Sequence, residues 1–208
     1  YGVQTGNGGF LMSGTQTKVN GNIYANGNIV ATIITGSAVA ANLPEATADQ
    51  VNNTPIPPTY NVTFAQATET QDFAQSFVIS QSFSFNSVKF YIKKVGSPSN
   101  ATVRILYDDN GSPGSPVSGL VGTLNASLVT ANYGWVAVSL PTTPILTAGN
   151  TYWVVIDASS SASKYYIIGG NDNGYASGVS KIGKYGDTWN DNTPSTLDTY
   201  FEIYLGGA

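Results

Sequence analysis

The side chains best suited to binding chemistry are aromatic residues in the last third of the chain, where they alternate with Gly, Asn and Asp. Aromatic rings beside polar amides suit sugars, because the C–H face of a sugar ring stacks on them while its hydroxyls bond to Asn and Asp. Tyrosine is also common in ordinary strands, so many of these rings are expected to pack a core or a sheet surface. Trp189 lies in the polar segment 186–192, which predicts a loop, and a tryptophan there needs either a cover or a ligand. The residues predicted to form a sugar-binding platform are Tyr175, Tyr185 and Trp189.

Two oxygen-rich turns, at 108–111 and 170–174, have the side chains that calcium prefers. The same residue types also make turns by bonding their own backbone, and neither segment has the spacing of an EF-hand. The second turn is the better candidate because it is longer. Its predicted calcium ligands are Asn171, Asp172 and Asn173, and no other cofactor is expected.

The composition argues against catalysis. The chain has no histidine and no cysteine, which removes Ser-His-Asp triads, imidazole or thiolate metal ligands and thiol chemistry. A glycosidase needs two carboxyl groups facing each other across a cleft. The three glutamates, Glu45, Glu69 and Glu202, lie in separate segments that nothing pairs. We therefore expect a protein that is not an enzyme.

Charge is sparse, at 10% of the 208 residues, and the net charge is −4 with eight Lys and Arg. Phosphate binding needs clustered cations, so nucleic acid is not an expected partner. Ser, Thr, Asn, Gly and Tyr take the place of charges, as is typical of extracellular β-proteins. No apolar run reaches the roughly 20 residues that a membrane helix requires. We expect a mature or truncated extracellular or cell-surface form whose export signal or membrane anchor has been removed.

Five Asn-X-Ser/Thr sequences are acceptors for glycosylation if the chain is secreted. Chance gives about as many in a chain this rich in Asn, Ser and Thr, so the pattern marks sites without showing that any is used. The acceptor residues are Asn52, Asn61, Asn100, Asn110 and Asn125.

A six-residue repeat lies near the start of the chain: residues 19–24 (VNGNIY) are followed by residues 25–30 (ANGNIV), and the pattern becomes weaker through residues 31–42. Gly-Asn corners and one inward aliphatic per period predict a parallel β-helix or a ladder of very short strands. Such repeats need about three stacked units, so this segment needs something to pack against. The residues predicted to mediate assembly are Val19, Ile23, Ile29, Ile33 and Ile34.

The chain divides into three zones. Residues 1–43 carry the repeat, residues 44–59 contain three prolines within four residues and predict a linker, and residues 60–208 predict a β-sandwich. Apolar and polar residues alternate in 88–93, whereas 152–156 is apolar on both faces and predicts a central strand covered on both sides. The expected fold is all-β: a jelly-roll-like antiparallel β-sandwich with an N-terminal extended or short β-helical segment.

Three segments carry a resemblance to a known family: 107–114 (YDDNGSPG), 122–124 (GTL) and 146–155 (LTAGNTYWVV). They resemble the signatures of bacterial extracellular β-sandwiches called choice-of-anchor domains, and the match covers about half of the chain. Residues 1–40 resemble the Gly/Asn-rich β-helical stalks of pilin-like exported proteins. In those proteins the stalk follows a membrane-spanning helix, which this sequence does not contain. The resemblance implies a cell-surface location and a role in display, adhesion or assembly, and it implies no reaction.

Two functions are consistent with these observations. The first is a structural subunit of a surface filament or pilus-like appendage, in which residues 19–43 add a strand to a second copy and form a homopolymer. The alternative for this segment is to fold back on its own sandwich. The second function is a carbohydrate-binding or adhesion module that holds a surface glycan with its loop aromatics.

Overall fold

The computed structural model describes residues 48–141 and 144–206, together with seven short strands nearer the N-terminus. These strands are β1 (Val3–Gln4), β2 (Phe10–Leu11), β3 (Lys18–Val19), β4 (Ile23–Ala25), β5 (Ile29–Val30), β6 (Ile33–Ile34) and β7 (Ala38–Ala40). The described residues contain only two helical turns, at Thr68–Thr70 and Ala126–Leu128, and neither has the length to cross a membrane.

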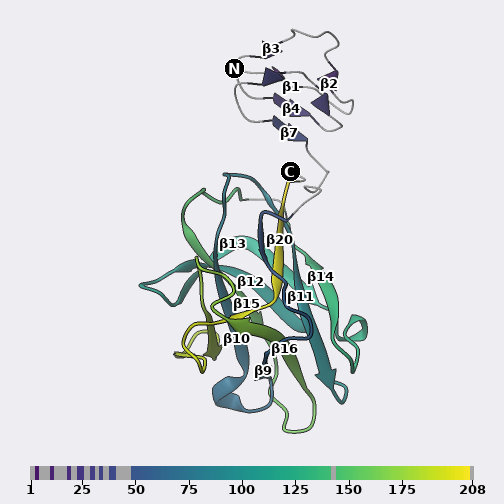
Figure 1. The fold of residues 1–208 in the computed structure, drawn as a ribbon, viewed down its shortest axis with the longest axis vertical. Helices are drawn as coiled ribbons and strands as arrows, with labels where there is room; N and C mark the ends of the chain where they lie inside the picture. Colours follow the sequence, from purple (N-terminus) through teal and green to yellow (C-terminus); the bar gives the residue numbers. More distant parts are fainter. Residues whose placement is uncertain are drawn as a thin grey trace.

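The strands β1 to β7 pair with one another, and every one of these pairings is parallel. β1, β4 and β7 form one small sheet (Figure 1). β2 pairs with β5, and β3 pairs with β6. Because three successive strands pair in order with the next three, the chain winds as a three-sided parallel coil, here called the coil. This arrangement is the short β-helical segment that the hexads predict.

All five residues predicted to mediate assembly lie in the coil, and their backbones pair within this chain. Val19 is opposite Ile34, and Ile33 is opposite Lys18. Ile29 is opposite Phe10, while Ile23 lies between Val3 and Ala38. The Ile23 side chain is fully buried. The described strands of the repeat therefore pair with one another.

Residues 48–206 form two antiparallel sheets that face each other, as the alternation predicts. The six-stranded sheet has the order β13-β12-β15-β10-β17-β18. The seven-stranded sheet has the order β19-β16-β11-β20-β8, with β14 added on β11 and β9 on β16. The strands are β8 (Gln50–Asn52), β9 (Tyr60–Phe64), β10 (Asp72–Val78), β11 (Phe85–Val95), β12 (Ala101–Asp108), β13 (Pro113–Leu124), β14 (Gly134–Ser139), β15 (Thr151–Asp157), β16 (Tyr165–Asp172), β17 (Ser180–Gly183), β18 (Trp189–Asp191), β19 (Leu197–Thr199) and β20 (Phe201–Leu205).

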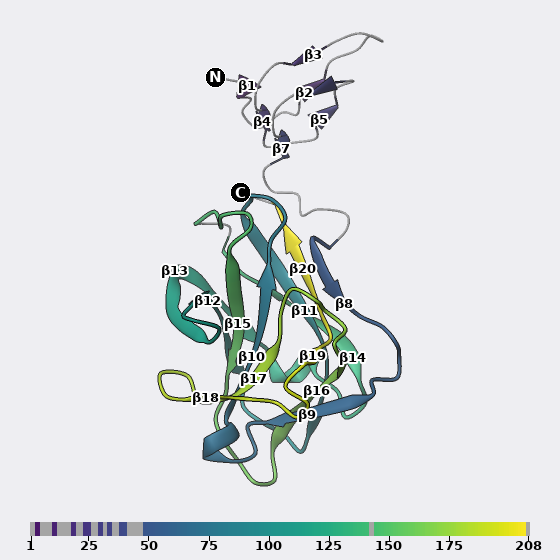
Figure 2. The same cartoon turned by 60° about the vertical axis from the view of Figure 1, so that its left-hand side comes forward.

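The sandwich begins earlier than the sequence predicts. β8 lies inside the range 44–59 that was expected to be a linker, and it pairs with β20 at the edge of the seven-stranded sheet (Figure 2). The buried Asn52 side chain donates hydrogen bonds to the Asn171 side chain, at 2.8 Å, and to the Thr199 carbonyl, at 3.0 Å. Part of the predicted linker is therefore an edge strand of the sandwich.

β15 is buried on both of its faces, as its sequence predicts. Tyr152, Val154 and Ile156 point into the main core between the sheets. Trp153 and Val155 point the other way, where they form a second cluster on the outer face of the six-stranded sheet with the buried residues Ala74 and Leu106. The partly buried residues that cover this outer cluster are Val179, Tyr185 and Trp189.

Substitution of the two neighbouring valines of β15, which point to opposite faces of the sheet, tests whether both faces are packed. Val154 and Val155 are both fully buried, so each change to Ala should lower the free energy of unfolding by about 2 kcal/mol. Val121, which is 41% exposed, provides the matched control, and V121A should change the free energy by less than about 0.5 kcal/mol. Urea unfolding measures all three variants. A V155A protein as stable as V121A would show that the outer cluster is not a packed core.

Candidate functional site

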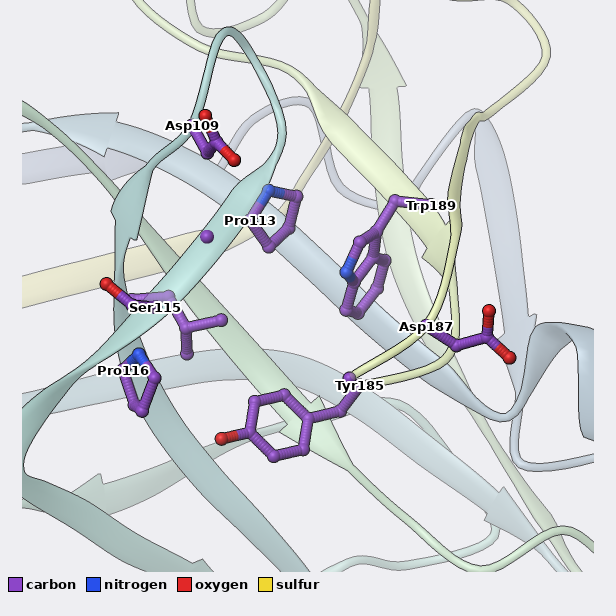
Figure 3. A pocket seen from close by; sticks show the side chains of 10 residues that line it. Asp109, Pro113, Ser115, Pro116, Tyr185, Asp187 and Trp189 are labelled. Carbon is purple, nitrogen blue, oxygen red and sulfur yellow. The ribbon is translucent and has the colours of Figure 1, made fainter.

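A hollow of about 320 Å³ lies beside the outer cluster, where two segments far apart in sequence meet. One wall is the β12–β13 hairpin, and the other is the loop that leads from β17 into β18 (Figure 3). The lining residues are Leu106, Asp109, Pro113, Gly114, Ser115, Pro116, Tyr185, Gly186, Asp187 and Trp189.

The hairpin wall is shaped by a tight turn. Asn110 and Gly111 both have positive φ, at 53° and 81°, which suits an Asn-Gly pair at the tip of a hairpin. The Asp108 carboxylate accepts a hydrogen bond of 3.1 Å from the Gly111 amide and so holds the turn. Gly114 follows where the strands close up, and a Cβ there would lie 2.8 Å from the Cβ of Asp109. The turn therefore fixes the start of β13, with its two prolines, as one side of the hollow.

The second wall depends on a buried carboxylate. Asp72 has no exposed surface, and its two oxygens accept hydrogen bonds from the backbone amides of Tyr185, at 2.7 Å, and Ala158, at 2.8 Å. The loop then turns at Gly186, where φ is 78°, and rejoins the sheet at Trp189, which pairs with Gly183. Asp72 thus anchors the segment that carries both aromatic residues.

The two rings both cover the sheet and line the hollow. Tyr185 and Trp189 are half-buried against the outer cluster. In Figure 3 their rings stand on one side of the hollow, opposite Pro113 and Pro116. The Arg104 guanidinium lies 4.8 Å from the centre of the Tyr185 ring, and it also forms an ion pair of 3.3 Å with Asp157. Trp189 therefore packs partly against the outer cluster, as a tryptophan in a polar segment requires, and it also lines the hollow, which a ligand can enter.

Only carboxylates contribute charge to the lining. Asp109 and Asp187 are exposed, and none of the described residues that line the hollow is a lysine or arginine. Two aromatic rings, two prolines and two carboxylates are a set that can stack on the C–H face of a ring and accept hydrogen bonds from hydroxyl or amine groups. The hollow lies at the small end of ligand sites, with room for a group the size of one sugar ring.

Tyr175 does not belong to the predicted platform. It is 8% exposed and packs edge-on against Phe201 in the main core, with 5.1 Å between the ring centres. Its hydroxyl donates to Gln50, at 2.6 Å, and accepts from the Val78 amide, at 3.1 Å. The ring and the hydroxyl of Tyr175 are therefore both used inside the fold, apart from Tyr185 and Trp189.

The residues predicted to bind calcium take part in hydrogen bonds and a tight turn within the fold. The Asn171 oxygen accepts the hydrogen bond from Asn52, and the Asn171 amide donates to the Thr54 carbonyl at 2.7 Å. Asp172 accepts a bond of 2.6 Å from the Thr196 hydroxyl, and Asn173 has a φ of 51°, as in a tight turn. The described residues contain no group of three or more acidic side chains placed to hold a metal. The turn is explained by its own hydrogen bonds.

The asparagines of the five Asn-X-Ser/Thr sequences differ in their exposure to solvent. Asn52 is 4% exposed and its amide is used in hydrogen bonds, so it cannot carry a glycan in the folded sandwich. The other four acceptors, Asn61, Asn100, Asn110 and Asn125, are exposed.

A second aromatic group lies on the seven-stranded sheet, and sequence reasoning missed it. Tyr91 lies opposite Trp135 and is stacked on Tyr133, with 5.2 Å between the ring centres and 9° between the ring planes. The Lys93 ammonium lies 4.4 Å from the centre of the Tyr133 ring. Burial, with a further contribution from Tyr91, raises the pKa of Tyr133 to about 12. These rings are largely engaged with one another, so this face is a weaker candidate than the hollow.

No family model matches the chain, and no curated protein sequence is significantly similar to it. The chemistry of the hollow must therefore be inferred from its own residues. Sequence reasoning identified Tyr185 and Trp189 but missed the opposite wall and Asp72, because their relation to the loop exists only after the sheet has formed.

The anchoring role of Asp72 predicts a pH dependence of stability. Burial raises the pKa of Asp72 above its ordinary value of 3.8, and the bonds from Tyr185 and Ala158 oppose that rise only in part. The folded protein therefore keeps this proton at pH values where the unfolded chain has released it. The contribution of Asp72 to stability is full below about pH 4 and decreases as the pH rises through the raised pKa.

The variant D72N should be less stable than the native protein by about 1–3 kcal/mol at neutral pH, because its amide group cannot accept both backbone bonds. The difference should widen as the pH falls towards about 4, since only the native protein gains the proton. Urea unfolding across this range measures it, with D187N as a control at an exposed carboxylate. If the difference in the free energy of unfolding between the native protein and D72N became smaller as the pH fell, the pKa of Asp72 would be lowered in the folded protein and not raised.

Proposed function

We propose that this chain is a non-catalytic structural protein of the extracellular space or cell surface, and a subunit of a filament or pilus-like appendage that assembles through its N-terminal coil. The observation that carries this proposal is the parallel pairing of the coil. β1 and β7 form the two edges of its three-stranded sheet, and each pairs on one side only within the described residues. An edge strand with free backbone groups is a ready site for a further strand.

The coil favours addition of a second copy end to end. The β7 edge of one copy can receive the β1 edge of the next, since both belong to the same parallel sheet. Such a contact joins two different surfaces, so it can be repeated from copy to copy, and it generates a filament when the rotation between copies does not close a ring. Repeat coils gain stability with each added neighbour, and this one has little more than two turns. The sparse net charge of −4 weakens repulsion between copies.

Removal of residues 1–43 should abolish self-association and leave the sandwich folded, because its sheets take no strand from that segment. Light scattering and negative-stain electron microscopy compare the full and shortened chains. A second variant, I23D, places a charge at a fully buried coil position in the full chain and should also remain monomeric. Equal assembly of the full and shortened chains, or monomers in every sample, would contradict the proposal.

A second function is supported by a separate observation, the hollow beside Tyr185 and Trp189. We propose that it binds a carbohydrate, which would make the displayed sandwich an adhesion module. The rings offer stacking surface, and the exposed carboxylates offer acceptors for hydroxyl groups. Assembly and adhesion use different parts of the chain, so one protein can do both.

Glycan-array binding should be lost in W189A, with a fall in affinity of at least about tenfold for any sugar that the native chain binds. W135A is the matched control, because Trp135 is also half-buried but lies on the other sheet. Equal losses in the two variants, or full binding by W189A, would show that the hollow is not the sugar site.

A further inference from the structure

We infer that the hollow selects sugars with free, protonated amines over neutral and acidic sugars. This inference rests on the proposed carbohydrate-binding role of the hollow and adds the class of sugar. It follows from three features of the site: the sign of its charges, the use already made of the nearby cations, and the kind of ring that forms its wall.

The charges that reach the hollow are negative. Asp109 and Asp187 lie on opposite walls, one in the hairpin and one in the 185–189 loop, and both are exposed (Figure 3). Asp108, which directly precedes Asp109 in the sequence, is not a lining residue, and its carboxylate accepts a hydrogen bond of 2.7 Å from the Trp153 indole. An acidic sugar would meet these carboxylates without a lysine or arginine among the described lining residues to pair with. A sugar with an ammonium group would meet charges of opposite sign.

The nearest cations do not change this balance. Arg104 contacts Tyr185, but its charge is compensated by Asp157 at 3.3 Å. Lys184 belongs to the turn that holds Asp187, where the Asp187 amide donates to the Lys184 carbonyl at 3.0 Å, and it is not among the residues that line the hollow. The charged residues among those that line the hollow are therefore Asp109 and Asp187.

The rings suit a cation as well as a sugar. The Arg104 guanidinium already lies 4.8 Å from the centre of the Tyr185 ring, so the ring for a ligand cation is that of Trp189. Tryptophan has the ring most attractive to cations, and Trp189 lines the hollow. An amino sugar combines a C–H face for stacking with an ammonium for the ring and the carboxylates. A simple organic ammonium such as choline has the ammonium group but no sugar ring, so a comparison of choline with an amino sugar separates the two kinds of ligand.

The test is a binding titration of the full chain at about pH 6, with tryptophan fluorescence as the signal. The probes are tetramers of glucosamine, N-acetylglucosamine and galacturonic acid, with choline as a fourth. At low salt the glucosamine tetramer should bind at least about fivefold more tightly than the acetylated tetramer, and the acidic tetramer should not bind detectably. At about 500 mM salt, which screens the charges, the affinities for the glucosamine tetramer and the N-acetylglucosamine tetramer should become nearly equal.

Two variants locate the effect. D109N and D187N should each reduce the preference for the free amine while leaving the affinity for the acetylated tetramer within about twofold of the native value. E69Q removes one negative charge from an exposed residue outside the hollow and should keep the preference. A preference unchanged in both aspartate variants, or lost equally in E69Q, would overturn the inference.

The outcomes also separate this inference from the proposed sugar-binding role. If all three tetramers bind equally and W189A abolishes binding, the hollow holds sugars and the charge selection is wrong. Choline binding as tightly as the glucosamine tetramer would make the site one for simple ammonium groups and would overturn the amino-sugar assignment. Absence of binding by every probe would overturn the amino-sugar inference and leave the general sugar role to the glycan array.

Discussion

The arrangement of the sandwich depends on one constraint: its six-stranded sheet is apolar on both faces at β15. Trp153 and Val155 are as deeply buried as the residues that face the main core, so the outer surface of this sheet must be covered by something other than the second sheet. The hairpin after β12 and the loop before β18 lie over this face, and the hollow is the space that they leave between them. The candidate site is thus a consequence of covering an apolar sheet.

The cover is held by polar contacts at its base. Asp72 is buried without a cationic partner, and backbone amides satisfy its carboxylate, one of them from the loop that carries Tyr185. The hydrogen bond from the Tyr185 amide holds the Tyr185 ring above the sheet, but it requires a carboxylate to be buried, which is unfavourable. On the other wall the Asp108 carboxylate bonds both the hairpin backbone and the Trp153 indole, so it connects the turn to the apolar cluster. The rigidity of the hollow comes from these two carboxylates.

The sequence was informative wherever the signal is local. The alternation in 88–93 and the apolar run at 152–156 predict strands correctly, since the strand period of two residues is written in neighbouring positions. β8 was mistaken for linker because a three-residue edge strand has too few positions to show that period and prolines follow it. Tyr175 and Tyr185 have similar Gly-rich surroundings in the sequence, and only the pairing of distant strands buries the first and leaves the second at the surface. The opposite wall of the hollow had no local signal for the same reason.

The pairing of β8 with β20 also has a mechanical meaning. The strand that enters the sandwich from the N-terminal side lies beside its last strand, so tension applied through the N-terminal segment would be borne first by an edge strand of three residues. Side-chain bonds reinforce this short strand: Asn52 holds Asn171, and Asn171 in turn holds the Thr54 carbonyl. The Tyr200 hydroxyl holds the next carbonyl, that of Pro55. These hydrogen bonds oppose peeling of the entering chain from the edge of the sheet.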